Sequence, residues 1–317
     1  MPKGAEARTT AVLTGRLARA PWGESRQRPP PHSRGNRWFL YLLPPLLFTL
    51  VLLLGSQIPF LYLSFFKDLR LGRVGTALTL SNYIALFSDP FYRNAAWQTL
   101  WLSASVAVMT LATGFPVAYI LARMKSRWSL FLLATIVTTS FITIVVKVLG
   151  IVIIFSAKGP LNRTLLWLGL ISQPFTIVGR ASGVIIGMMH FTLGFAVMLM
   201  YSVIRTIPSS LEEAAQIHGS SRLRVFRRVV VPLAAPGIVT TGLVVFNLSM
   251  GAFTSTALLG SGNVFTLPIL IQQTVILETK YAIGASIAMV LLVATLLVNL
   301  ISVFAISRFR STRMVQA

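Results

Sequence analysis

The stretch SSLEEAAQIHGSSRLRVFRRVVVP, residues 209–232, is polar and charged, although the sequence on both sides of it is strongly apolar. Each of its first two serines precedes a glutamate by three residues, Glu212 and Glu213, which is the capping-box pattern of a helix start. Gly219 follows the first helical run, where a glycine commonly takes the left-handed conformation that ends a helix. The stretch therefore predicts a helix, a glycine turn and a second helix outside the membrane.

We expect the second helix to cover residues 221–230. On it Phe226 shares an apolar face with Leu223 at the i, i+3 spacing, whereas Arg224 lies on another face. Pro232 has no backbone N–H group, so we expect it to end this helix and to begin the next membrane span. An amphipathic helical pair of this kind could also lie flat at the lipid headgroups, with the serines acting as ordinary caps.

The composition is that of a membrane protein, because 55% of the 317 residues are hydrophobic and 11% are charged, with a mean hydropathy of +0.77. Apolar runs of about 20 residues can cross a bilayer as helices. The sequence predicts an all-α polytopic membrane protein with six spans and a cytoplasmic helix pair between the fourth and the fifth. The expected spans are 39–65, 97–121, 130–154, 183–204, 237–258 and 283–306.

The positions of the lysines and arginines predict the orientation, since these residues gather on the cytoplasmic side of membrane spans. Nineteen lie in the N-terminal tail, the 122–129 loop, the 205–236 segment and the C-terminal tail, and eight lie in the opposite loops. Both termini are therefore predicted to be cytoplasmic. Because the net charge of +21 is divided among alternate loops, we expect membrane lipid and no nucleic acid as a partner. The predicted parts are a disordered basic cytoplasmic arm (1–37), a transmembrane domain (38–308) that includes a cytoplasmic segment (206–236), and a cytoplasmic tail (309–317).

Two short motifs in the opening stretch carry a resemblance to a known family. EAAQIHG, Glu213 to Gly219, is followed after nine residues by VVVP, Val229 to Pro232. This spacing resembles the EAA loop of the permease subunits of bacterial ABC importers. The stretches TGFPVAYILAR and ALLGSGNVFTLPILI are similar to the spermidine/putrescine-type branch of these permeases, and the resemblance covers roughly residues 38–308. Many relatives carry a carboxylate in the region of SMGAFTSTALLG, where this chain has Ala252.

The resemblance implies a type I ABC importer permease in the bacterial inner (plasma) membrane. It implies that the helix pair couples to separate ABC ATPase subunits, that an extracytoplasmic binding protein delivers the solute, and that a second permease subunit completes the path. The solute would be polyamine-like or a similar small organic molecule. The expected coupling residues are Glu212, Glu213, Ala214, Ala215, Gly219, Arg224, Phe226 and Pro232.

Three polar residues inside the predicted spans are candidates for the solute path: Lys147, Asn247 and Ser249. Lys147 could have a structural role, in which its ammonium reaches the membrane surface or pins a helix end. Alternatively, it contacts the solute. Asn247 either forms an interhelical hydrogen bond or lines the path. The predicted spans contain no carboxylate, which argues against this chain holding a cation and leaves an anionic or zwitterionic solute open.

The sequence lacks the motifs of an enzyme. It has no G-x-x-x-x-G-K-[ST] phosphate loop, no H-E-x-x-H and no G-x-S-x-G, so we expect no cofactor, no metal and no ATP hydrolysis by this chain itself. A self-sufficient secondary transporter or channel is the alternative function. Secondary transporters commonly place several ionisable groups at mid-membrane, and here only Lys147 is available, which favours the importer.

Overall fold

The computed structural model describes residues 37–69 and 72–314, with the backbone alone for 37–40 and 305–314. The predicted basic arm therefore lies outside the described residues, apart from Arg37, where α1 (Arg37–Leu63) begins. The described residues divide into two units, with the boundary between Ser56 and Gln57. The second unit contains all the other helices and the sites described below.

Six of the described helices are long and apolar enough to cross a membrane, as the sequence predicted. They are Tyr41–Leu63, Pro90–Arg123, Ile144–Trp167, Ala181–Arg205, Arg222–Met250 and Tyr281–Phe304.

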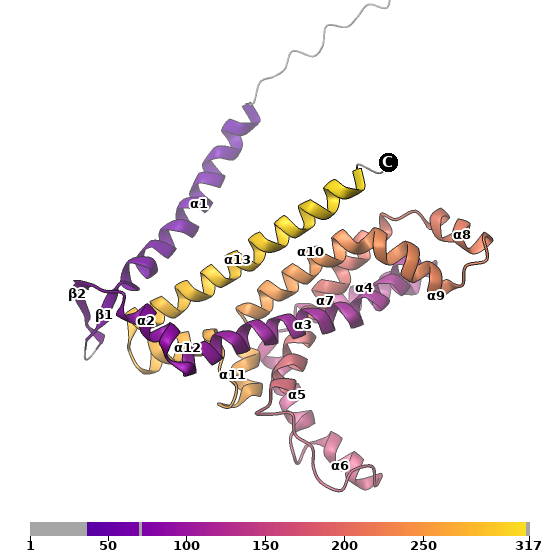
Figure 1. Ribbon diagram of the computed structural model, residues 1–317. Helices are drawn as coiled ribbons and strands as arrows, with labels where there is room; N and C mark the ends of the chain where they lie inside the picture. Colours follow the sequence, from indigo (N-terminus) through magenta and orange to yellow (C-terminus); the bar gives the residue numbers. More distant parts are fainter. Residues whose placement is uncertain (1–36, 70–71, 315–317) are drawn as a thin grey trace, which may run out of the picture. The chain divides into compact units, whose positions relative to one another are not determined.

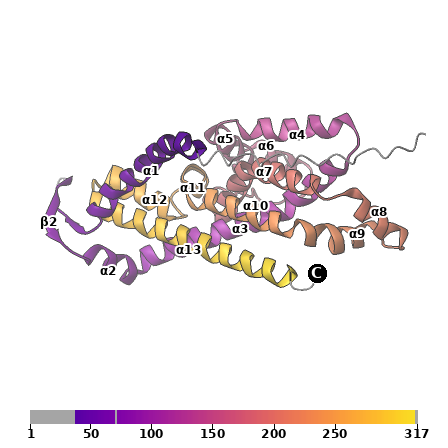
Figure 2. The same cartoon turned by 90° about the horizontal axis from the view of Figure 1, so that it is seen from above.

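The core of the larger unit is formed by α3 (Pro90–Arg123), α7 (Ala181–Arg205) and α10 (Val231–Met250), which pack on one another (Figure 1). Between α3 and α7 the buried hydroxyls of Thr110 and Thr192 lie 3.2 Å apart and share a hydrogen bond. The last helix, α13 (Tyr281–Met314), packs against α10. The view from above also shows α13 running alongside α10 (Figure 2).

Close approach of helices depends on glycine at two places in this core. Gly194 of α7 lies against Ser140 of α4 (Arg127–Ser140), so that a Cβ at this position would overlap the Ser140 hydroxyl. Gly237 of α10 lies against the side chain of Val203 in the same way. Small residues that allow backbones to approach are the usual means of packing helices in membranes.

The expected continuous span over 130–154 is wrong, because two helices occupy this region. After α4 the chain turns at residues 141–143 and continues as α5 (Ile144–Phe155), which is followed by α6 (Pro160–Trp167). The hydroxyls of Thr139 and Ser140 donate to the carbonyls four residues earlier, at 2.8 and 3.2 Å. Such back-bonding competes with the backbone ladder, and Ser140 also lies against Gly194 of α7 at this point.

The expected stop at Pro232 is also wrong. The helix of α9 (Arg222–Val225) continues through a π-helical turn, η2 (Phe226–Val230), directly into α10. Here the N–H of Val231 donates to the carbonyl of Phe226, five residues earlier. The wider turn lets the helix continue past a proline that cannot donate. The expected span over 237–258 therefore begins earlier, and it ends at Met250 before the short helix α11 (Thr254–Gly260).

The described chain contains one small β-element that the all-α expectation did not include. β1 (Phe66–Asp68) and β2 (Val74–Leu78) pair antiparallel and precede α2 (Ser81–Ser88). The carboxylate of Asp68 accepts hydrogen bonds from the N–H groups of Ala282 and Ile283, at 2.9 and 2.8 Å, and so caps the start of α13. Before α13 lie α12 (Leu267–Gln272) and a second π-helical turn, η3 (Gln273–Leu277).

Candidate functional site

The α8–α9 hairpin, residues 209–225, has the predicted helix, turn and helix. α8 (Ser209–Ile217) ends in a turn in which Gly219 has φ +80°. The N–H of Gly219 donates to Gln216 O at 2.9 Å, and the N–H of Ser220 donates to Ala215 O at 3.1 Å. These two bonds form a Schellman motif, which requires a left-handed residue at the glycine position.

The expected capping box at the start of α8 is not formed. The N-cap residue is Pro208, and no side chain accepts a hydrogen bond there. Glu212 instead turns toward the end of α3 and is buried, with 6% of its surface exposed. The carboxylate finds charged and phenolic donors there, which bind it more strongly than a single backbone N–H would.

Glu212 joins α8 to α3 through three contacts. Its Oε2 accepts a hydrogen bond from Tyr119 Oη at 2.8 Å, its Oε1 accepts one from Arg123 Nε at 2.7 Å, and Arg123 Nη2 lies 2.6 Å from Oε1. Arg123 also donates to Ile207 O at 3.0 Å, so one guanidinium holds both α8 and the chain that leads into it. All of these donors belong to the last two turns of α3.

Phe226 forms a second attachment to the same end of α3. Its ring centroid lies 5.3 Å from that of Phe115 and 5.0 Å from that of Tyr119. Aromatic pairs at these separations add to the apolar burial. Tyr119 therefore contacts both helices of the hairpin, one through its hydroxyl and the other through its ring. Leu223, expected on the same face as Phe226, is instead 63% exposed.

The other side of the hairpin carries exposed residues of mixed character. Glu213, Ala214 and Arg224 are exposed, Ala215 is half-buried, and Ile217 is 84% exposed. Large apolar side chains at 45–84% exposure, such as Leu211, Leu223 and Ile217, are unusual on a charged segment and are typical of an interaction surface. The hairpin thus has one face attached to α3 and one free to meet a partner (Figure 1).

Tyr119 and Arg123 were not among the predicted site residues. They lie four residues apart and therefore on one face of α3. A phenol and a cation one turn apart, at the end of a predicted span that is expected to be cytoplasmic, were the available signal. Their partner Glu212 is 89 residues beyond Arg123 and 93 beyond Tyr119, so the sequence alone did not connect them.

The three predicted path residues lie on two helices, Lys147 on α5 and both Asn247 and Ser249 on α10. Lys147 of α5 is buried at 8% exposure, and among the described residues its Nζ has no hydrogen-bond partner. Asn247 of α10 and Asn299 of α13 exchange two amide hydrogen bonds, at 2.9 and 3.0 Å. Ser249 is buried and donates to Val245 O of its own helix at 2.8 Å. The Asn247 contact is the interhelical hydrogen bond that the sequence left as one of two possibilities.

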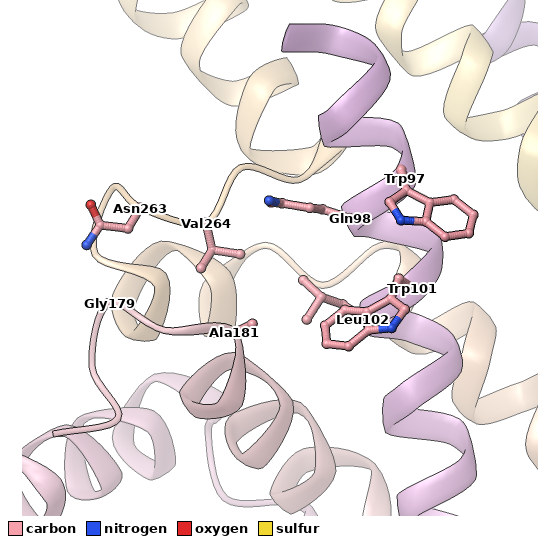
Figure 3. A pocket seen from close by; sticks show the side chains of 8 residues that line it. All are labelled: Trp97, Gln98, Trp101, Leu102, Gly179, Ala181, Asn263 and Val264. Atoms are coloured by element: carbon pink, nitrogen blue, oxygen red, sulfur yellow. The ribbon is translucent and has the colours of Figure 1, made fainter. Parts of the chain in front are cut away.

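A cavity of about 350 Å³ lies at the opposite end of α3 from Arg123. Figure 3 shows Gln98 pointing toward the loop that carries Asn263 and Val264, with the indole rings of Trp97 and Trp101 on α3. Leu102, Gly179 and Ala181 complete the lining, which contains indole and amide groups but no ionisable side chain. At 1.5 Å per residue, α3 separates this cavity from the Glu212 site by roughly 30 Å.

Comparison with known proteins identifies the family. Residues 114–311 match the family described as "Binding-protein-dependent transport system inner membrane component". The chain belongs to this family. It is therefore a multi-pass inner-membrane permease of the ABC transporter class, and the alternative of a self-sufficient transporter or channel is set aside.

Individual relatives agree with this assignment. The permease is 35% identical over 190 residues to the spermidine/putrescine transport system permease protein PotB of Escherichia coli (strain K12), covering 60% of this chain and 69% of that protein. It is 29% identical over 211 residues to PotB of Haemophilus influenzae, covering 67% and 73%. The fold matches that of a bacterial alginate ABC transporter in complex with an alginate pentasaccharide-bound periplasmic protein. That match has a TM-score of 0.70 and 19% identity over 84% of this chain and 92% of that one.

Proposed function

We propose that the permease couples ATP hydrolysis on a separate subunit to solute import through the α8–α9 hairpin. This proposal rests on the different surroundings of two adjacent glutamates. Glu212 is buried against Arg123 and Tyr119, whereas Glu213 faces outward. A partner that moves the outer face of the hairpin would therefore move α3, because the hairpin is attached to it by charged and aromatic contacts.

The path for the solute is formed, in this proposal, together with a second permease subunit. An extracytoplasmic binding protein delivers the solute, and both termini and the hairpin lie on the cytoplasmic side. The excess of lysine and arginine in the segments on that side supports the orientation. The printed names of the relatives support a small, polyamine-like or similar organic solute.

Charge reversal and charge removal at Glu213 test the coupling role. Glu213→Lys should abolish association with the ATPase subunit and solute-stimulated ATP hydrolysis, while the abundance of the permease in the membrane is preserved. Glu213→Gln keeps the size of the side chain and removes only its charge, so a partial loss would identify ion pairing with the partner. Glu212→Gln is the matched inward variant, because it loosens the hairpin from α3 without altering the outer face.

Variants of Glu213 and Glu212 should lose different activities. Pull-down of the ATPase subunit should be lost in Glu213→Lys and kept in Glu212→Gln, whereas ATP-driven uptake should fall in both. Normal ATPase binding and normal uptake in Glu213→Lys would overturn the proposed coupling surface.

A further inference from the structure

Two buried polar groups without hydrogen-bond partners lie at the junction of α5, α7 and α11. Within the described part of the chain, neither the Nζ of Lys147 on α5 nor the Oγ of Ser255 on α11 has a partner. Lys147 is 8% exposed and Ser255 is fully buried. Because α11 packs against both α5 and α7, the two groups belong to one three-helix junction (Figure 1).

α7 relates the two groups to each other. A methyl group at Gly187 of α7 would lie 3.6 Å from Ser255 Oγ, so Ser255 faces this glycine. The helix that carries Lys147, α5, packs against α7 as well. Lys147 and Ser255 are therefore buried on two helices that pack on each other and on α7.

The described chain supplies no counterion for this ammonium. Its carboxylates all lie outside the junction: Asp68, Asp89, Glu212, Glu213 and Glu278. Asp68, Asp89, Glu212 and Glu278 are bonded to other groups, and Glu213 is exposed on α8. A buried ammonium without an acceptor is among the most costly groups in a protein interior. The junction is therefore rich in donors and complementary to an anion.

We propose that Lys147 and Ser255 form a closed binding site for a carboxylate of the transported solute. On this view the solute is an amine-bearing organic acid and not a bare polyamine. The amine agrees with the relatives, and the buried positive charge repels a solute that carries only positive charge. This inference rests on the proposed import function and names its substrate class.

The helices around the site, α11 and α5, are bordered by helix breaks that would let them move apart. α11 has only seven residues and follows the break after Met250, and it is followed by Ser261 and Gly262 at φ +47° and +77°. α5 begins after the interruption at residues 141–143. Movement of α11 away from α5 in the transport cycle would expose both donors to the path.

A matched pair of solutes tests the substrate class. Ornithine and putrescine share a diamine skeleton, and ornithine adds one carboxylate. In proteoliposomes with the complete complex, the wild type should favour ornithine in competition with putrescine. Lys147→Met should raise the KM for ornithine about tenfold, the loss of one charge-assisted hydrogen bond, and Lys147→Arg should retain most of the preference. Lys158→Met, which alters an exposed lysine, is the control and should change nothing.

A second readout does not depend on which solute is carried. The chain has no cysteine, so Ser255→Cys introduces its sole thiol while Lys147 stays in place. During ATP turnover this thiol should react faster with a sulfonate-bearing thiosulfonate reagent than with a trimethylammonium one. Adding Lys147→Met should remove that preference.

The remaining outcomes separate this inference from the proposed function. One contrary outcome is uptake in Lys147→Met that falls equally for both solutes, together with poorer assembly of the complex. That result would mean that Lys147 pairs with a carboxylate of the second permease and not with the solute, and it would overturn the inference. So would a thiol that stays unreactive in every nucleotide state, or a wild type that takes up putrescine and rejects ornithine. Absence of any ATP-dependent uptake in the wild type would instead contradict the proposed import function.

Discussion

Arg123 Nη2 lies 2.6 Å from Glu212 Oε1, and this ion pair joins the last turn of α3 to the first turn of α8. Only 8% of the glutamate side chain and 20% of the arginine side chain are exposed. Salt bridges at a protein surface contribute little, whereas leaving one partner of a buried pair unpaired is costly. The pair therefore holds the hairpin to the end of α3.

Breaking this pair should loosen the hairpin. Arg123→Gln leaves the Glu212 carboxylate with Tyr119 alone and should lower the local stability of residues 206–221 by about 2–3 kcal/mol. Hydrogen exchange of α8 measures this change. A double-mutant cycle with Glu212→Gln should give a coupling energy above about 1 kcal/mol, and additive effects would contradict the ion pair. Glu213→Gln is the exposed control and should leave the exchange rates unchanged.

The turn at Gly219 should respond to backbone conformation and not to side-chain volume. A Cβ there would meet nothing within 4 Å, but φ is +80°. Gly219→Val should therefore cost about 1–2 kcal/mol and tilt α9, while Gly219→Asn, which tolerates the left-handed region, should be milder. ATPase coupling measured in the two variants should follow the same order. Equal effects of Gly219→Val and Gly219→Asn would indicate that residue 219 contacts the ATPase subunit and that backbone strain is not the cause.

The Asn247–Asn299 pair should contribute to packing and not to transport. Asn247→Leu leaves the Asn299 amide with only its bond to Thr295 O and should destabilise the complex by about 1 kcal/mol. Replacing both by Leu should recover part of this loss. Thermal unfolding of the purified complex gives the comparison. A changed KM for uptake in the double variant would instead place Asn247 on the solute path.

Gly194→Ala should disturb the packing of α4 on α7, because the added methyl group would overlap Ser140. Overpacking of this kind costs about 1–3 kcal/mol. Gly150→Ala on α5 is the matched control, since nothing lies within 4 Å of a Cβ there. Thermal unfolding of both variants checks the difference, and equal stability would show that α4 and α7 can separate at no cost.

Local patterns predicted much of this fold. The six spans and the Gly219 turn follow from apolar length and from helix-end chemistry, both of which act within a few residues. Which of two adjacent glutamates is buried depended on Arg123, far away in the chain, and no local pattern could decide it. The interruption near Ser140 and the passage through Pro232 likewise follow from tertiary packing and from a widened turn, which a 3.6-residue periodicity does not represent.

The π-helical turn between Phe226 and Val230 also sets the direction in which the exposed face of the hairpin points. One surplus residue in a helix advances everything beyond it by about 100° around the axis, since an α-helix has 3.6 residues per turn. Residues 222–225 therefore point in a direction that a regular helix running back from α10 would not give them. If the same residues formed a regular α-helix here, every residue of the outer surface would be preserved and yet that surface would point in the wrong direction. In the proposed coupling, the fit between the permease and the ATPase subunit thus depends on this angle as well as on side-chain chemistry.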